Sequence, residues 1–237
     1  MRLVKWEALP AEMQNDAVRK YYDILQKKRV ALFFKRVVDV AVSLLLLILL
    51  LPLFLLLALI IKLDSQGPVF YRQERVTQYG ERFRIFKLRT MNKGADTGSQ
   101  ITREGDARIT RVGRVIRGLR LDELAQLIDV LRGKMTLVGT RPEVPRFLSY
   151  YTPEMLATLL LPAGITSVAS IYYKDEAALL AGSENTEQVY VQRVLPEKMR
   201  YNLKALENFS FWGDIKVMGM TALAMLGKTY RNGGEEK

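Results

Sequence analysis

Residues 37–61 read VVDVAVSLLLLILLLPLFLLLALII, an almost unbroken run of Leu, Ile, Val, Phe and Ala. About 20 apolar residues in a helix cover a hydrocarbon core about 30 Å thick. A helix in the core of a soluble protein would show polar residues on its solvent face, and this run shows no such face. The run therefore predicts a membrane segment, with Lys35 and Arg36 before it and Lys62 after it.

Pro52 divides this run. A proline inside a helix removes one backbone donor and its ring clashes with the preceding turn, so a helix kinks or breaks there. The arm from Val37 to Leu51 has 15 residues and is roughly 22 Å long, too short to cross a bilayer. Either a kinked helix spans the membrane, or the two arms form a re-entrant hairpin. Transmembrane helices tolerate proline, which favours spanning, whereas basic residues on both flanks argue against it.

Composition limits the chemistry. The 237 residues have room for one domain of ordinary size, the membrane segment and a short N-terminal extension. The chain contains neither Cys nor His, which excludes disulfides, thiol nucleophiles, His bases and ordinary Cys/His zinc sites. Any reaction must therefore use carboxylates, Lys, Arg, Tyr, Ser or Thr, with a hard metal such as magnesium where one is needed.

The net charge of +11 has two main explanations. A positive cytoplasmic face could rest on anionic lipid headgroups, or arginine forks could bind phosphate-rich small molecules. Beside a membrane anchor we do not expect nucleic acid as a partner. Because no small-residue cleavage site follows the apolar run, we expect the chain to be retained whole.

Several segments predict secondary structure. Residues 1–34 predict one helix on the surface of the main domain. Residues 69–71 and 83–89 alternate apolar with other side chains, as strands do, and Tyr79-Gly80 suits a tight connection between them. Of the basic residues in the second strand, Lys87 and Arg89 could both reach one anion, although lone cations are usually solvated.

Later segments predict loops, turns and helices. Polar composition predicts loops at 92–106 and 182–190, and Pro162 to Thr166 predicts a turn. Pro196 begins a helical pattern that runs to Phe209. An apolar helix from Ile215 to Leu226 could lie in the membrane interface with Trp212 as its anchor.

Arginines recur every third residue from 108 to 120, with apolar residues between them. A three-residue step drifts around a helix by about 60°, so these arginines do not form one stripe. They predict a short amphipathic helix at the membrane interface, with its last arginines turned toward a site.

Asp122 and Glu123 follow directly. Acids in the first turn of a helix complement its dipole, which explains many such pairs without any chemistry. Here the pair lies among arginines that could hold a phosphate, and the chain has no other grouped polar set suited to covalent chemistry. Adjacent helical residues point about 100° apart, so we expect different roles, one nucleophile and one metal ligand. A short apolar strand and a glycine turn then present Arg141 before a proline.

The order of these features resembles the bacterial sugar transferases, specifically the small monotopic phosphoglycosyl transferases that act on polyprenol phosphate. Five blocks between residues 35 and 142 carry the resemblance, and together they are specific: Lys35-Arg36-Val37-Val38-Asp39, 64–75 (DSQGPVFYRQER), 86–91 (FKLRTM), Leu121-Asp122-Glu123-Leu124 and Val138-Gly139-Thr140-Arg141-Pro142. The match extends over about residues 35–222. Three positions depart from the family pattern: Leu51, Thr140 and Ala163.

The resemblance implies an α+β, mostly helical fold. Its parts would be an N-terminal extension (1–34), a re-entrant membrane helix hinged at Pro52 (35–62), a cytoplasmic sugar transferase domain with amphipathic interfacial helices and short strands (63–226) and a polar tail (227–237). The protein would lie in the bacterial inner membrane, facing the cytoplasm. Its oligomeric state, including a homo-oligomer, stays open.

The resemblance also implies a ping-pong reaction. Asp122 would attack the sugar-bearing phosphate of a UDP-sugar and release UMP, and polyprenol phosphate would then accept the phosphosugar. Glu123 would hold Mg²⁺, Arg117 and Arg141 match phosphate-binding positions, and Lys87 and Arg89 are weaker matches. The alternatives are a non-enzymatic membrane-anchored scaffold that binds anionic lipid or a partner, and an ordinary glycosyltransferase that releases UDP.

Overall fold

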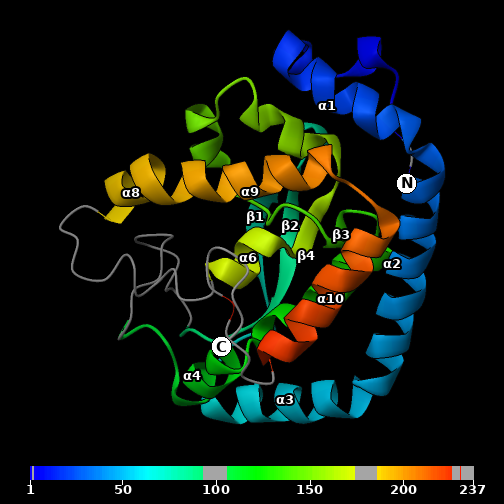
Figure 1. Cartoon of the computed structure of the whole chain (residues 1–237). Coiled ribbons are helices and arrows are strands. Elements are labelled where there is room, and N and C mark those ends of the chain that lie inside the picture. Colours follow the sequence, from blue (N-terminus) through cyan, green and yellow to red (C-terminus); the bar gives the residue numbers. More distant parts are fainter. Residues whose placement is uncertain (2, 93–105, 174–185, 226–229, 231–237) are drawn as a thin grey trace.

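The computed structural model describes residues 1, 3–92, 106–173, 186–225 and 230, and it is a mostly helical α+β protein (Figure 1). Helices α2 (Arg29–Leu49) and α3 (Leu51–Asp64) run along two adjoining sides of the molecule. The short strands lie between them and the other helices. The predicted combination of a mainly helical fold with a few short strands is confirmed.

The apolar run forms two helices rather than one. α2 and α3 are bent by 61° at a break that falls at Leu50, and Pro52 is the second residue of α3. A proline fits there because the first N–H groups of a helix have no partner within it. In the described ranges no single helix has the length and apolarity to cross a membrane, whereas the bent pair together meets both criteria as a broken span or a re-entrant loop.

The first sheet agrees with the sequence. Strands β1 (Phe70–Val76) and β2 (Arg82–Leu88) are antiparallel, with Tyr71 opposite Lys87. Between them a 3₁₀ turn holds Tyr79 and Gly80 at φ values of 58° and 77°. The predicted strands and their tight connection are therefore confirmed.

The second sheet corrects one prediction. Strand β3 (Met135–Val138) pairs in parallel with β4 (Ala163–Thr166), so the turn predicted at Pro162 to Thr166 is a strand after its first residue. A Cβ on Gly164 would lie 2.2 Å from the amide nitrogen of Gly139. Glycine is present here because the two backbones touch, and not because the chain turns.

α2 is fastened to the rest of the protein by its few polar residues. Lys35, Asp39 and Ser43 are spaced four apart, so they share one helix face, and all three are buried. The carboxylate of Asp39 accepts the hydroxyl of Thr136 at 2.6 Å and the amide of Leu137 at 3.0 Å. The ammonium of Lys35 also donates to the carbonyl of Val138 at 2.7 Å, so Asp39 and Lys35 bind α2 to β3.

The prediction of one helix over the N-terminal residues 1–34 is wrong. It has two 3₁₀ turns, at Trp6–Ala8 and Ala11–Met13, then α1 (Asp16–Lys27), and α2 already begins at Arg29. The side chain of Asn15 caps α1 by accepting the amide of Val18 at 3.0 Å, which explains why that helix starts there. Apolar residues of this region share a core with Leu159, Leu160 and Phe209.

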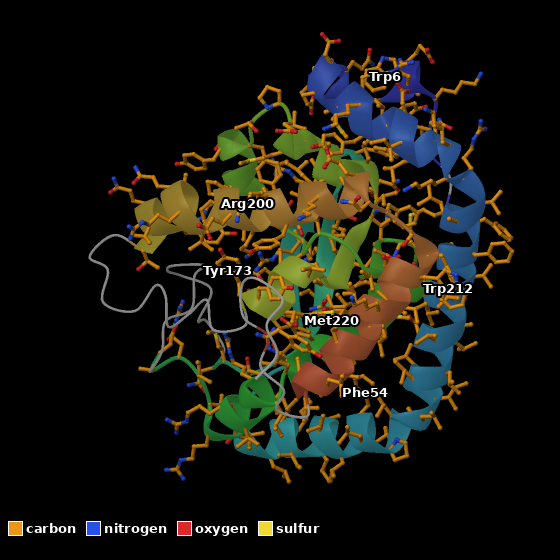
Figure 2. The ribbon with its side chains drawn as sticks, viewed as in Figure 1. Trp6, Phe54, Tyr173, Arg200, Trp212 and Met220 are labelled. Carbon is orange, nitrogen blue, oxygen red and sulfur yellow. The ribbon has the colours of Figure 1, made fainter. Side chains whose placement is uncertain are left out.

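The remaining elements complete the domain. They are α4 (Arg111–Gly118), a 3₁₀ turn at Leu121–Gln126, α5 (Leu127–Leu131), 3₁₀ turns at Pro145–Tyr150 and Met155–Leu160, α6 (Val168–Tyr172), α8 (Thr186–Val189), a π-turn at Tyr190–Val194, α9 (Leu195–Glu207) and α10 (Phe211–Met225). The predicted helices near Pro196 and Ile215 are confirmed. Figure 2 shows Trp212 near α2, and 75% of its surface is exposed.

The two loop predictions have different outcomes. The loop predicted at 182–190 is wrong from Thr186 onward, because α8 and the π-turn continue into α9 as one helical stretch. Residues 182–185, most of the loop predicted at 92–106 and the predicted tail at 227–237, apart from Tyr230, lie outside the described residues.

Candidate active site

Asp122 and Glu123 lie in a tight turn between two helices. After α4 the chain reverses at Arg120, whose φ of 54° is left-handed, and it enters the 3₁₀ turn at Leu121–Gln126. The predicted α-helical first turn is therefore a 3₁₀ turn, and α-helix begins only at Leu127. With three residues per turn, neighbouring side chains point about 120° apart. The two carboxylates are thus directed to different surroundings.

Glu123 is the anion of a partly buried charge cluster. Arg141 donates from Nη1 to Oε2 at 3.1 Å and from Nη2 to Oε1, which makes a two-pronged pair. The ammonium of Lys87 lies 3.9 Å from Oε1. Burial by itself raises the pKa of Glu123, but the charge and hydrogen bonds of Arg141 and the charge of Lys87 outweigh it and hold the pKa well below its ordinary value. Glu123 is therefore a carboxylate at any ordinary pH.

The pKa of Lys87 is lower than that of an ordinary lysine. Burial lowers its pKa to about 8, the charge of Glu123 opposes this shift, and the charges of Arg141 and Arg75 add to it. The β1–β2 pairing explains its place: Lys87 shares a sheet face with Phe83 and Ile85, which are buried in the core. The strand thus carries the ammonium group inward, to the turn that holds Glu123.

Asp122 has a different environment. It is 9% exposed, and no described residue donates a hydrogen bond to its carboxylate. Burial raises its pKa, the charge of Glu123 raises it further, and the charges of Lys87, Arg117 and Arg141 oppose the shift. The value near 3.9 of an isolated aspartate is therefore too low here. Among the described residues this carboxylate therefore has three cations near it and no hydrogen-bond donor, which are the properties that a nucleophile requires.

Most of the predicted site residues come together, from separate elements. Asp122 and Glu123 come from the 3₁₀ turn, Lys87 from β2, Arg117 from the last turn of α4 and Arg141 from the segment after β3. Each of the three cations affects the pKa of Asp122. The structure thus gathers an acidic pair and three cations in one place, an arrangement suited to a phosphate group.

Arg89 is not brought into this site. Its guanidinium is buried and donates to the carbonyl oxygens of Gln66 and Ser65, both at 2.6 Å, and of Ile61 at 3.2 Å. These carbonyls belong to the C-terminal end of α3 and the residues after it, where a helix leaves acceptors without partners. Arg89 therefore caps α3, and it does not share an anion with Lys87.

The sequence did not point to three further residues near the charge cluster around Glu123, namely Arg75, Glu143 and Tyr190. Arg75 lies on the same sheet face as Lys87, opposite Phe83 and four residue pairs from the Tyr71–Lys87 pair, and its side chain is largely buried. Glu143 lies 4.0 Å from Arg75 and accepts the hydroxyl of Tyr190. The period of two along β1 could have placed Arg75 on the same sheet face as Lys87. Nothing in the sequence signals Tyr190, which is distant along the chain.

The described residues contain no group of three or more His, Cys, Asp or Glu side chains that could hold a metal ion by themselves. Mg²⁺ is commonly bound by one or two carboxylates together with substrate phosphates, and Glu123 beside Asp122 fits that pattern. Both oxygens of Glu123 accept hydrogen bonds from Arg141, so Glu123 would become available to Mg²⁺ when Arg141 turns to another anion.

A family model described as "Bacterial sugar transferase" matches residues 30–228. Over 197 residues the chain is 38% identical to a UDP-glucose:undecaprenyl-phosphate glucose-1-phosphate transferase of Caulobacter vibrioides, which covers 81% of this chain and 69% of the relative. It is 34% identical over 198 residues to a UDP-N-acetylgalactosamine-undecaprenyl-phosphate N-acetylgalactosaminephosphotransferase of Aeromonas hydrophila, covering 82% and 44%.

A third relative, an undecaprenyl-phosphate glucose phosphotransferase of Komagataeibacter xylinus, is 36% identical over 196 residues, which cover 79% of this chain and 35% of the relative. The chain therefore spans less than half of two of these proteins. In all three, the similarity takes in most of this chain, and the matched family region contains every residue of the charge cluster around Glu123.

Proposed function

Because this chain belongs to the bacterial sugar transferase family, we propose that it transfers a phosphosugar from a UDP-sugar to undecaprenyl phosphate and releases UMP. The observation that carries the proposal is the carboxylate of Asp122, which has no hydrogen-bond donor among the described residues and lies among Lys87, Arg117 and Arg141. A nucleophile that meets a phosphate needs this arrangement, because cations offset the repulsion between two anions.

In the first half-reaction, an oxygen of Asp122 attacks the phosphorus atom that carries the sugar. A bond forms between the carboxylate and this phosphorus, the bond to the bridging oxygen of the diphosphate breaks, and UMP leaves with that oxygen. An ionised carboxylate attacks without the help of a base, in agreement with a chain without histidine. Arg117, Arg141 and Lys87 bind the phosphate oxygens and stabilise the negative charge that develops on them.

In the second half-reaction, an oxygen of undecaprenyl phosphate attacks the same phosphorus atom. The bond to Asp122 breaks, which restores the carboxylate, and the phosphosugar is joined to the lipid as a diphosphate. Two displacements with one covalent intermediate divide a difficult transfer into two easier ones. The cations can serve both steps, because a phosphate group occupies the same place in each.

Glu123, with the donor phosphates, would hold Mg²⁺ in this scheme. When bound, the ion supplies positive charge to the diphosphate. For Glu123 to bind the ion, Arg141 has to leave the carboxylate of Glu123 and bind a donor phosphate instead. The pair seen in the structure therefore fits the protein before its donor arrives.

We also propose that α2 and α3 form a re-entrant membrane segment and that the rest of the chain lies on the cytoplasmic face of the inner membrane. The 61° bend and the apolar composition of the pair support this placement. So do the exposed apolar side chains along both helices, including Leu45, Ile48 and Leu55. In this arrangement the acceptor lipid reaches the site from the bilayer that holds the helices.

The central experiment measures nucleotide release. The purified protein is mixed with undecaprenyl phosphate, Mg²⁺ and a panel of UDP-sugars that includes UDP-glucose and UDP-N-acetylgalactosamine, with Asp122→Asn in parallel. We expect the wild type to release UMP with its preferred donor and Asp122→Asn to release essentially none. Release of UDP would reassign the reaction to an ordinary glycosyltransferase, and equal release by both proteins would remove Asp122 from the mechanism.

The membrane arrangement has its own test. Single cysteines are placed at positions 30 and 64 of this cysteine-free chain and labelled in intact vesicles with a reagent that does not cross the bilayer. A re-entrant pair leaves both positions on one side, so both react or neither does. Labelling of only one position would show that the helices span the membrane.

A further inference from the structure

The carboxylate of Glu143 is held from three directions beside the candidate site. Its Oε1 accepts the amide of Val144 at 2.9 Å, its Oε2 accepts the hydroxyl of Tyr190, and the guanidinium of Arg75 lies 4.0 Å away. The side chain is only 12% exposed. A buried carboxylate is stable only when it is paired and hydrogen-bonded, so these contacts fix Glu143 in one orientation.

The backbone around Arg141 is fixed as well. The carbonyl of Thr140 accepts the amide of Gly164 at 2.8 Å, and the carbonyl of Glu143 accepts the amide of Val76 at 2.9 Å. Between them, Arg75 reaches the carbonyl of Pro142 at 3.5 Å. Arg141 therefore projects from a segment that is held on both sides, and its guanidinium reaches Glu123 across the site.

Tyr190 reaches Glu143 from a π-turn, a rare helical geometry that is frequently found at functional sites. One extra residue in a turn rotates the following side chains by about 100° relative to a regular helix. Tyr190 can therefore face Glu143 while α9 keeps its own buried face on the core. Its ring packs on Phe147 at 4.9 Å between centroids, which sets the direction of the hydroxyl.

We propose that Tyr190 and Glu143 are positioning residues that hold the Arg141 segment so that the guanidinium meets the donor phosphate. The inference rests on the proposed function, because the binding of phosphate by Arg141 is part of that proposal. Neither residue touches the reacting atoms. Tyr190 orients Glu143, and Glu143 with Arg75 orients the backbone from which Arg141 projects.

The first test replaces Tyr190 by Phe, which keeps the ring on Phe147 and removes only the hydroxyl. We expect kcat/KM for the UDP-sugar to fall roughly tenfold or more, about the effect of one hydrogen bond to a charged group, with a raised KM. A purely structural role would leave fewer folded molecules and lower the apparent kcat without a change of KM. Tyr150→Phe is the matched control, because its exposed ring also packs on Phe147.

A double-mutant cycle tests whether the effect passes through Arg141. Arg141→Lys keeps a charge but not the two-pronged geometry. If Tyr190 acts through Arg141, Tyr190→Phe changes kcat/KM much less in the Arg141→Lys background than in the wild type. Equal fold-changes in both backgrounds would overturn the inference. Glu143→Gln, combined with Arg141→Lys in the same way, serves if Tyr190→Phe does not fold.

Binding separates this inference from the proposed function. The dissociation constant of the donor is measured by calorimetry in the Asp122→Asn background, with and without Tyr190→Phe. A weaker donor complex with Tyr190→Phe supports the positioning role, and an unchanged one overturns it. Absence of UMP release from the wild type, with donor binding intact, would overturn the proposed reaction alone.

Discussion

Arg141 donates to both carboxylate oxygens of Glu123, so the residue next to the proposed nucleophile is already paired with a cation. The pair joins the segment after β3 to the turn after α4. It brings a proposed phosphate ligand and a proposed metal ligand into direct contact. The two proposed roles therefore exclude each other until the donor binds.

This exclusion makes a prediction about metal binding. Arg141→Gln should raise the affinity of the donor-free protein for Mn²⁺, used in place of Mg²⁺, by about tenfold or more, because a positive charge beside Glu123 is removed. Electron paramagnetic resonance of free Mn²⁺ measures this affinity. Glu123→Gln in the same background should abolish the gain. An Arg141→Gln protein that binds Mn²⁺ no better than the wild type would show that the pair does not block the metal.

The lowered pKa of Lys87 predicts that activity falls at alkaline pH, which gives the pH profile an alkaline limb. Burial lowers that pKa to about 8, so the ammonium form is lost as the pH rises through about 8 and phosphate binding weakens. We expect kcat/KM for the donor, which reports the free enzyme, to fall above this pH. In Lys87→Arg the guanidinium stays charged, so the limb should move to higher pH even if the rate is lower. A limb that stays in place would belong to another group.

A substitution of Arg89 distinguishes a structural role of this residue from a role in binding the donor. Because it caps the end of α3 with three hydrogen bonds, Arg89→Met should lower the free energy of unfolding by about 3 kcal/mol. The KM for the donor should change little in the protein that remains folded. Thermal unfolding and initial rates measure the two effects, with the exposed Arg84→Met as the control. A large rise in KM at unchanged stability would instead return Arg89 to the phosphate site.

The close contact between the backbones of Gly164 and Gly139 gives another prediction. A Cβ on Gly164 would lie 2.2 Å from the nitrogen and 2.3 Å from the oxygen of Gly139. Neither backbone can give way cheaply, so Gly164→Ala should cost about 3 kcal/mol or more and lower the yield of folded protein. Gly219→Ala is the control, because a Cβ there meets no atom within 4 Å. Chemical denaturation of both variants measures the difference.

The acidic pair and most of its cations could be predicted because local rules apply to them. The strand that carries Lys87 and the turn that presents Arg141 follow from alternation and from glycine, and the break in the apolar run follows from Pro52. The expectation for Arg89 failed because a strand pattern cannot tell which end of a neighbouring helix lies beside a cation. That depends on how α3 packs against β2.

The turn predicted from Pro162 to Thr166 failed for a related reason. Glycine in a sequence signals either a turn or a close approach of two backbones, and only the fold distinguishes them. Gly164 belongs to the second kind, because a Cβ there would meet the backbone of Gly139, the residue directly after the neighbouring strand β3. The contact of Tyr190 with Glu143 could not be predicted either, since a π-turn has no simple pattern and the two residues are far apart in sequence.

The polar face of α2 has a consequence for anyone who wishes to produce this protein without detergent. Excision of the two apolar helices is the obvious shortcut, but it would leave the hydroxyl of Thr136 and the amide of Leu137 without the carboxylate of Asp39. Asp214 would lose its ion pair with Lys35, and Arg89 would lose the carbonyl of Ile61. The apolar helices are therefore also a structural support of the domain, and a trimmed version should not fold unless those orphaned groups are redesigned.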